Sequence, residues 1–250
     1  MKILIILLIF VVIISSKSIE KLPSSLKVCN YQDPARDECI RDSIEHFLSA
    51  LHQEPNSIDF PSIEPFVYDT VTFKYNNPGF VQGWFTVRDQ KSYGISRAKV
   101  INLKSDFTDE EMELQAIVNF PKLFTIGNYK SNISLGVLKI ESKGQFNVST
   151  YDVTAKWTIK GKLEEKKGEK FMKIHQFDVL PEAKNMKISA SGLFPDQELN
   201  KFANNFLNQH WQLFYQEMIP ETRQQWEPIF RDISNKLFSQ IPFKKLLLKN

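Results

Sequence analysis

Residues 194–243 read FPDQELNKFANNFLNQHWQLFYQEMIPETRQQWEPIFRDISNKLFSQIPF. Apolar residues recur in this segment at steps of three and four, which places them on one broad stripe of an α-helix. We expect Asp196 to be the N-cap, while Pro220 and Pro228 either kink one helix or, at Pro220, separate two helices. A single helix from Asp196 to Leu237, the last residue of the stripe, would extend ~60 Å. Because such an apolar helix cannot stand alone in water, the rest of the chain must cover it.

The middle of the chain, residues 66–188, reads as one β-strand after another. The alternation typical of a strand with one buried face runs through Met112, Leu114, Ala116, Val118 and Phe120. Residues 144–160 form an unusually long strand whose apolar face changes parity, so we expect a bulge near residues 149–151. Since a long bulged strand bends, the expected fold class is α+β, with a long C-terminal helix wrapped by a strongly curved antiparallel β-sheet.

The N-terminal segment MKILIILLIFVVIISSKS has the features of a secretory signal peptide. Lys2 supplies the charged start, an apolar run follows, and Ser16 and Ser18 fit the small-residue rule for cleavage. The alternative is a membrane anchor, which needs about 20 apolar residues, more than this run provides. We therefore expect residues 1–18 to be removed and residues 19–250 to form one secreted, extracellular domain.

The chain has two cysteines, Cys29 and Cys39, on either side of Asp33-Pro34, which marks the start of a helix. An even, local pair in a secreted chain is typical of a disulfide, which here would tie the incoming chain to the first turns of that helix. A redox or metal role is the alternative. The spacing is not C-x-x-C, however, and no histidine lies near enough in sequence to suggest a zinc site.

Charge and motifs narrow the classes of function. Without Lys2 and Lys17 the formal net charge of +3 falls by two, which argues against a nucleic-acid partner. The sequence contains no G-x-S-x-G, H-E-x-x-H, Walker or G-x-G-x-x-G motif, so we expect no enzyme activity, no cofactor and no metal. Two N-x-[ST] sequons, at Asn132 and Asn147, permit glycosylation, and Asn147 should point outward if its neighbours point inward.

Five phrases carry a family resemblance when they are taken in order. They are CNYQDPARDECI (29–40), PSIEPFVYDTVTF (61–73), GQFNVSTYDVTAKWTIKGKL (144–163), NKFANNFLNQHWQLFYQEMIP (200–220) and IFRDISNKLFSQIPF (229–243). In this order, and after a signal peptide, they resemble the insect takeout and juvenile-hormone-binding protein family over nearly the whole mature chain. Residues 207–211, LNQHW, are similar to the family's L-N-x-N-W signature.

The resemblance implies a tubular lipid-binding fold and a secreted carrier that holds a hydrophobic small molecule in an internal tunnel. The ligand classes it implies are juvenile hormone, terpenoids and long-chain lipids, and Cys29 and Cys39 correspond to the family's N-terminal disulfide. Two departures leave ligand choice open. Residues 52–56 stand where the family often has a Gly-Ile-Pro-type phrase, and His210 replaces the second Asn of the signature.

Composition alone does not distinguish a tunnel from a filled core, because both use the same residue types. From face parity, the sheet side of a tunnel would be lined by Met112, Leu114, Val118, Phe120, Phe146, Val148 and Trp157. The helix side would be lined by Phe202, Phe206, Leu213 and Phe214. We expect a monomer whose partner is a hydrophobic small-molecule ligand, with transient contact to a membrane or receptor left open.

The alternative function is a membrane-surface or protein-interaction module of the same fold, with a filled core and no ligand. Its support is the apolar and basic tail FKKLLLK, residues 243–249. The simpler interpretation of this tail is a frayed chain terminus. An enzyme with an unrecognised site would need several polar residues converging inside the wrapped sheet.

Overall fold

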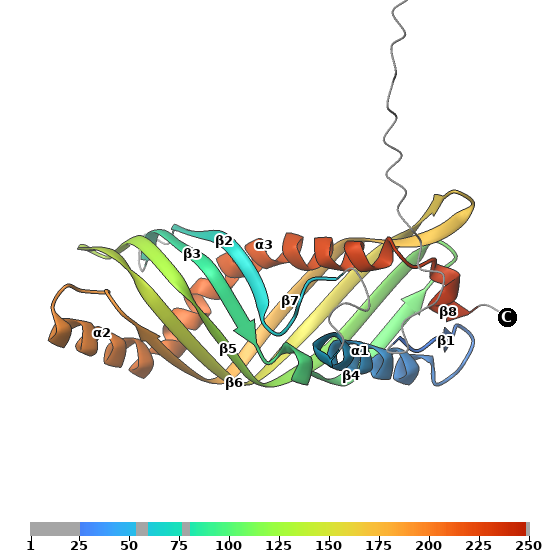
Figure 1. Cartoon of the computed structure of the whole chain (residues 1–250), viewed down its shortest axis with the longest axis horizontal. Helices are drawn as coiled ribbons and strands as arrows, with labels where there is room; N and C mark the ends of the chain where they lie inside the picture. The colour runs from blue at the N-terminus through green and yellow to red at the C-terminus, as the bar shows by residue number, and fades with distance from the viewer. Residues whose placement is uncertain (1–25, 54–59, 77–80, 249–250) are drawn as a thin grey trace, which may run out of the picture.

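A curved antiparallel sheet forms most of the molecule (Figure 1). The computed structural model describes residues 26–53, 60–76 and 81–248, so the expected signal peptide lies outside the described residues. The long strands are β2 (Phe66–Asn76), β3 (Val81–Tyr93), β5 (Glu111–Leu135), β6 (Leu138–Lys166) and β7 (Glu169–Ala190). They lie in the order β2-β3-β5-β6-β7, with every neighbouring pair antiparallel. The fold class predicted from the alternation and the resemblance is confirmed.

One side of β5 is shared by two strands that follow each other end to end. β3 pairs with residues 124–135 of β5, and β4 (Lys99–Phe107) pairs with residues 112–119. A short 3-10 helix, η1 (Ile95–Arg97), makes the step from one to the other. We name the ends of the sheet by the helices beside them. The α1 end comprises β4 and residues 111–120, 153–166 and 169–183; the α2 end comprises the β2–β3 pair and residues 123–135, 138–150 and 186–190.

The long strands change their inward face where the two ends of the sheet meet. In β6, Val148 and Thr150 face inward on one side of Asp152, and Val153 and Ala155 face inward on the other. Asp152 has a φ of 50°, a left-handed conformation that rotates the strand by one side-chain position. The expected face change is thus present, beside the expected position.

The bulge expected at residues 149–151 is absent from the pairing of β6. Tyr151 pairs with Lys122 and Val153 pairs with Phe120, so the register is the same before and after Asp152. The reason is that β5 and β7 change their inward face at the same level as β6. The three strands therefore stay in register, and none of them needs an extra, unpaired residue. A register shift does occur in β3, between Arg88 and Lys91, around the left-handed Asp89.

Two helices complete the C-terminal half (Figure 1). They are α2 (Gln197–Gln209) and α3 (Trp211–Phe238). As expected, Asp196 caps α2, and its Oδ1 accepts a hydrogen bond of 2.9 Å from the Leu199 amide. The break between the helices falls at His210, with φ −115° and ψ 22°. α3 then runs along the sheet against β7 and β2, whereas α2 lies at one end of the molecule in contact with β7.

The prolines do not separate the helices, because Pro220 and Pro228 both lie inside α3. Each proline leaves the carbonyl four residues earlier without its helical partner. Those carbonyls belong to Gln216 and Gln224, which are exposed, so water can satisfy them. A proline on the solvent side of a helix is therefore tolerated here without ending it.

The N-terminal region and the C-terminal tail are joined at the α1 end. Helix α1 (Arg36–Gln53) begins after Asp33, whose Oδ1 accepts a hydrogen bond of 2.8 Å from the Ala35 amide. The predicted disulfide joins Cys29 to Cys39. Strands β1 (Cys29–Asn30) and β8 (Leu247–Leu248) pair in parallel, preceded by the 3-10 helix η2 (Phe243–Lys245).

The tail is docked, which corrects the expectation of a frayed terminus for the described residues 243–248. Leu247 is buried and its strand is hydrogen-bonded to β1, with the Cys29 amide donating to the Leu246 carbonyl at 3.1 Å. Lys244 forms an ion pair of 2.8 Å with Glu169. Leu247 is therefore used within the fold, whereas Leu248 stays 47% exposed, and the interaction module remains an untested alternative.

Candidate functional site

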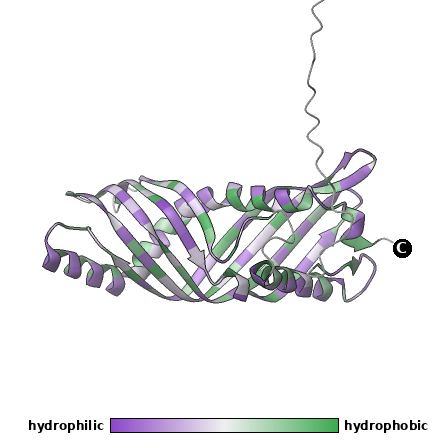
Figure 2. Cartoon of the chain, in the orientation of Figure 1, coloured by the Kyte–Doolittle hydropathy of each residue, from purple (hydrophilic) through white to green (hydrophobic). Residues whose placement is uncertain are grey.

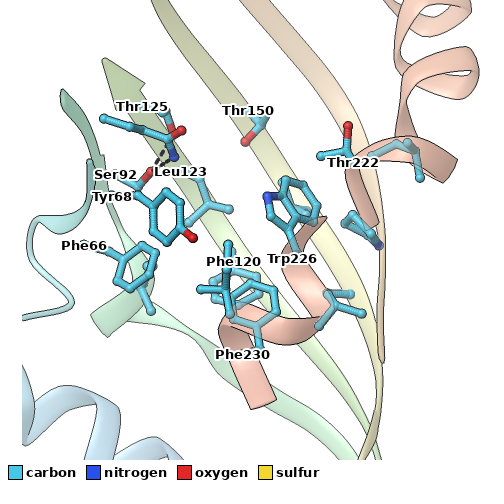
Figure 3. A pocket seen from close by; sticks show the side chains of 18 of the residues that line it. Phe66, Tyr68, Ser92, Phe120, Leu123, Thr125, Thr150, Thr222, Trp226 and Phe230 are labelled. Atoms are coloured by element: carbon cyan, nitrogen blue, oxygen red, sulfur yellow. Dashed lines mark hydrogen bonds between the residues drawn. The ribbon is translucent and has the colours of Figure 1, made fainter. Parts of the chain in front are cut away.

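A cavity of about 1180 Å³ lies between the inner face of the sheet and the helices. Its walls come from every long strand, from the apolar face of α1 and from α3, and it extends past α2. The alternation of apolar and polar residues along each strand is visible in Figure 2. Figure 3 shows a part of the wall, where Phe120 of β5 and Phe230 and Trp226 of α3 border the same space.

Most of the residues nominated from the sequence line this cavity. On the sheet side these are Met112, Leu114, Phe120, Phe146, Val148 and Trp157. On the helix side they are Phe202, Phe206 and Phe214. Their contact with a ligand stays a prediction, since what the structure gives is their place on the wall.

Val118 does not line the cavity. It is 0% exposed and belongs to a core cluster with Val100, Ala116 and Ala155. The apolar face of α1 packs against this cluster, because α1 lies on the inner face of the sheet at this level. Parity placed Val118 on the correct face, but at this point a helix rather than open space meets that face.

Leu213 also lies outside the cavity, and its side chain is 47% exposed. Trp211 and Phe214 of the same helix do face inward. A step of two residues turns an α-helix by about 200°, so a residue two positions after Trp211 points away from the cavity. The sequence pattern missed this because it carried one helical phase through His210, where the structure has a break.

Several groups of wall residues were not nominated from the sequence. They include the inward residues of β2, β3 and β7, such as Phe73, Phe85 and Val179, the apolar face of α1, such as Ile44, and the second half of α3, such as Trp226. The α1 and α3 residues belong to stripes that the sequence does show. The missing information was that both helices face the same cavity, which is a property of tertiary packing.

The cavity wall is nearly free of charge. Among its lining residues in the described part of the chain, Lys27 alone carries a formal charge, and it pairs with Asp42 at 3.5 Å. Burial affects two tyrosines of the wall, Tyr75 and Tyr215. Burial raises the pKa of Tyr75 to about 12; the charge of Glu221 adds to the rise and the Thr222 hydroxyl opposes it.

Tyr215 behaves in the same way as Tyr75. Burial raises its pKa to about 12, and the nearby charge of Glu182 adds to the rise. Its hydroxyl donates to the Pro181 carbonyl at 2.8 Å, whereas the buried hydroxyl of Tyr75 has no hydrogen-bond partner among the described residues. The wall therefore offers apolar surface and neutral hydrogen-bonding groups, and little that could hold an ion.

A row of asparagines attaches α2 to β7. Asn200, Asn204 and Asn208 lie four residues apart and so share one face of the helix. The Asn208 side chain accepts from the Ile188 amide at 2.9 Å and donates to the Ile188 carbonyl at 2.7 Å. Asn204 does the same with Ala190, at 2.8 Å in both directions. Polar side chains thus position α2, and its apolar residues remain available.

The apolar residues of α2 border the open end of the cavity. Leu199, Phe202 and Phe206 line it, yet Phe202 is 69% exposed. Leu138, at the start of β6, also lines the cavity and is exposed. At the α2 end the cavity therefore meets solvent through an apolar rim.

Among the described residues, no cluster of three or more His, Cys, Asp or Glu residues could hold a metal ion. Every helix in the described ranges falls short of the length and apolarity that a bilayer span needs.

The two sequons lie on β5 and β6. Asn147 is exposed, on the opposite face from Phe146 and Val148, as its position between two inward residues predicted. Asn132 is half-buried, and its side-chain amide donates to Glu141 at 2.9 Å. Asn147 is therefore the more accessible of the two acceptors.

Known proteins share this sequence pattern and this fold. The model of the family described as "Haemolymph juvenile hormone binding protein (JHBP)" matches residues 5–248. The circadian clock-controlled protein daywake of Drosophila melanogaster is 23% identical over 236 residues, covering 92% of this chain and 90% of that protein. Its counterpart in Drosophila yakuba is 23% identical over 229 residues, covering 88% and 86%.

A solved structure has the same fold. The crystal structure of Takeout 1 from Epiphyas postvittana superposes with a TM-score of 0.71 at 18% identity, covering 90% of this chain and 100% of that one. At that identity the likeness concerns the arrangement of sheet and helices, and it agrees with the match to the family.

Proposed function

The chain belongs to the haemolymph juvenile hormone binding protein family, and on that premise we propose that it is a secreted carrier of a hydrophobic small molecule. The ligand would occupy the cavity of about 1180 Å³ between the sheet and the helices. The observation that carries the proposal is the wall of this cavity, which is apolar and, among the described lining residues, bears a formal charge only at Lys27. Juvenile hormone, other terpenoids and long-chain lipids are the ligand classes we propose.

The energetic basis for binding is removal of apolar surface from water. Each Å² of apolar surface that the ligand and the wall bury together contributes about 25 cal/mol. Ligand pockets in proteins commonly enclose about 300–1,000 Å³, so this cavity is large enough for an elongated lipid. An ion would find no comparable stabilisation, because a buried charge needs a partner.

The remaining features of the proposal concern how the carrier is made and where it acts. Residues 1–18 would act as a signal peptide and residues 19–250 as one extracellular domain. The Cys29–Cys39 disulfide fits an oxidising compartment. In this proposal the carrier is a monomer without enzyme activity, and Asn147 is the preferred glycan acceptor.

Extraction of the purified native protein with organic solvent, followed by mass spectrometry, tests the proposal directly. We expect a co-purifying lipid, and we expect an uncharged fluorescent probe to bind and to be displaced by added lipid. A clean extract together with no probe binding would contradict the carrier function.

A blocking substitution places the ligand in the cavity. Val148 lines the wall, so Val148→Trp should fill part of the space and weaken probe binding at least tenfold. Lys187 is exposed on the neighbouring strand, and Lys187→Trp is the matched control that adds the same side chain outside the cavity. Equal binding by the two variants would show that the probe sits elsewhere.

A further inference from the structure

A belt of uncharged polar side chains crosses the wall of the cavity partway along its length. It consists of Tyr68 on β2, Gln90 and Ser92 on β3, Thr125 on β5 and Thr150 on β6. Figure 3 shows Tyr68, Ser92, Thr125 and Thr150 projecting into one space, with Thr222 of α3 at its border. All five belt residues come from strands whose other inward residues are mostly apolar.

The belt is partly linked by hydrogen bonds. The Gln90 side-chain amide donates to Ser92 Oγ at 3.1 Å, and Ser92 Oγ lies 3.0 Å from Thr125 Oγ1. Tyr68 and Thr150 have no hydrogen-bond partner among the described residues, whereas Tyr129 and Tyr215, elsewhere on the wall, donate to backbone carbonyls. Both residues are half-buried on the cavity wall, so a ligand that displaces water from the cavity has to supply the hydrogen-bond partner of each hydroxyl.

The face changes in the strands decide which polar residues point inward. In β3, Val87 faces inward and Asp89 follows it by two positions, so an unbroken strand would turn Asp89 and Lys91 toward the cavity. The left-handed Asp89 and the register shift turn Gln90 and Ser92 inward instead. Both charged side chains are left exposed outside.

The same device operates in β6. There the inward residues Val148 and Thr150 would be followed by Asp152, but the left-handed conformation at Asp152 turns it outward. Its carboxylate accepts a hydrogen bond from Asn119 at 2.7 Å and pairs with Lys184. At this level the sheet therefore excludes charged side chains from the cavity and admits uncharged hydrogen-bonding ones.

Apolar wall lies on both sides of the belt. Along β6, Phe146 and Val148 precede Thr150, and Val153 and Trp157 follow it. An elongated molecule that filled the cavity would place its two ends against these apolar stretches and the middle of its chain at the belt.

We propose, on the basis of the carrier function, that this belt binds an uncharged polar group in the interior of an elongated apolar ligand, such as an ester, a ketone or an alcohol. The hydroxyl and amide groups of the belt can both donate and accept hydrogen bonds. They can therefore pair with a ligand group that only accepts, such as an ester or a ketone, and with one that also donates, such as an alcohol. A carboxylate at the belt would be buried without a cation, which is unfavourable. The nearest formal charge on the described wall, Lys27, pairs with Asp42 outside the belt.

The test compares a symmetrical long-chain ketone with the alkane of the same chain length, each displacing an uncharged fluorescent probe from the full-length mature protein. We expect the ketone to bind about tenfold more tightly than the alkane. Replacing the linked hydroxyls in Ser92→Ala/Thr125→Val should reduce this preference about five- to tenfold, with alkane affinity unchanged, since each hydrogen bond to a neutral group contributes about that factor.

The matched control is a hydroxyl pair of the same kind on the outer face of the same sheet. Thr72 Oγ1 and Thr86 Oγ1 lie 2.8 Å apart on β2 and β3, and neither residue lines the cavity. Thr72→Val/Thr86→Val should leave the ketone preference as it is. Tyr68→Phe, which removes one oxygen and leaves the fold otherwise unchanged, should lower the preference about threefold to fivefold even if the double variant does not fold.

The outcomes separate the belt from the carrier function. Equal affinity of the wild-type protein for ketone and alkane, or an undiminished preference in Tyr68→Phe and in the folded double variant, overturns the belt and leaves the carrier intact. Failure of both ligands to displace the probe overturns the carrier function itself, and the belt with it.

Discussion

The two ends of the sheet use similar apolar residues in opposite ways. At the α1 end, helix α1 covers the inner face, the disulfide and β8 fasten the chain terminus, and Val118 is completely buried. At the α2 end, asparagine side chains hold the helix, and Phe202 and Phe206 stay partly exposed at the rim of the cavity. The difference teaches that one apolar stripe can serve as packing or as a lining, depending on what covers it.

The largest expected effect comes from the same substitution made at each end. Phe177, at the α1 end, is buried and packs its ring 5.4 Å from Trp157 and 5.7 Å from Phe230. Phe177→Ala should lower the free energy of unfolding by about 3–5 kcal/mol, because this buried ring, which also borders the cavity, loses its packing against Trp157 and Phe230. Phe202→Ala, at the exposed rim, should cost less than about 1 kcal/mol.

Chemical denaturation of the two variants measures this difference. Phe202→Ala should keep its stability and lose part of its affinity for an apolar probe, because Phe202 lines the cavity at its rim. Similar losses of stability in both variants would mean that the two ends are packed alike.

A smaller effect is expected where α2 is attached. Asn204→Ala removes both hydrogen bonds to Ala190, whose backbone groups are then left without that partner. We expect a loss of about 1–3 kcal/mol, confined to α2, which hydrogen exchange of the α2 amides would detect. Asn205, the next residue, is exposed and makes no such bond, so Asn205→Ala is the matched control. Unchanged exchange in Asn204→Ala would contradict the role of the asparagines.

The smallest effect concerns the buried hydroxyl of Tyr75 in the wall. Because burial raises its pKa to about 12, the folded state favours the neutral form, and the resulting stability is complete below the unfolded pKa near 10. This stability declines as the pH rises toward about 12. At about pH 11 we expect a loss of ~1.4 kcal/mol relative to Tyr75→Phe.

Denaturation of the wild type and of Tyr75→Phe from neutral to alkaline pH measures this loss. The two proteins should have similar stability near neutrality, since removing a hydroxyl without a partner costs little. Parallel profiles up to about pH 12 would show that Tyr75 ionises as freely in the folded state as in the unfolded one.

Sequence reasoning predicted the fold because strands and helices leave local patterns of apolar and polar residues along the chain. Alternation located the strands, the three-and-four spacing located the helices, and the face change in β6 was expected within a few residues of Asp152. The disulfide followed from two cysteines in a chain that we expected to be secreted.

The site was predicted less completely. The alternation along a strand tells which face of the sheet a side chain is on, but it does not tell whether a helix or the cavity lies against that face. Val118 and Phe120 share a face, yet α1 covers the first and the cavity opens before the second. The helix break at His210 changed the phase for Leu213. The four-residue spacing of Asn200, Asn204 and Asn208 is visible in the sequence. Their hydrogen-bond partners are backbone groups of β7, and the sequence pattern does not predict these.

The asparagines also bear on how copies of the chain behave toward one another. The last strand of an open sheet presents unpaired N–H and C=O groups, which can template the addition of a strand from another molecule. Along β7, Asn204, Asn208 and Asn235 engage these groups, and Pro181 has no N–H to offer. The side-chain amides that attach the helices therefore also occupy backbone groups that a strand of another molecule would need for pairing with β7.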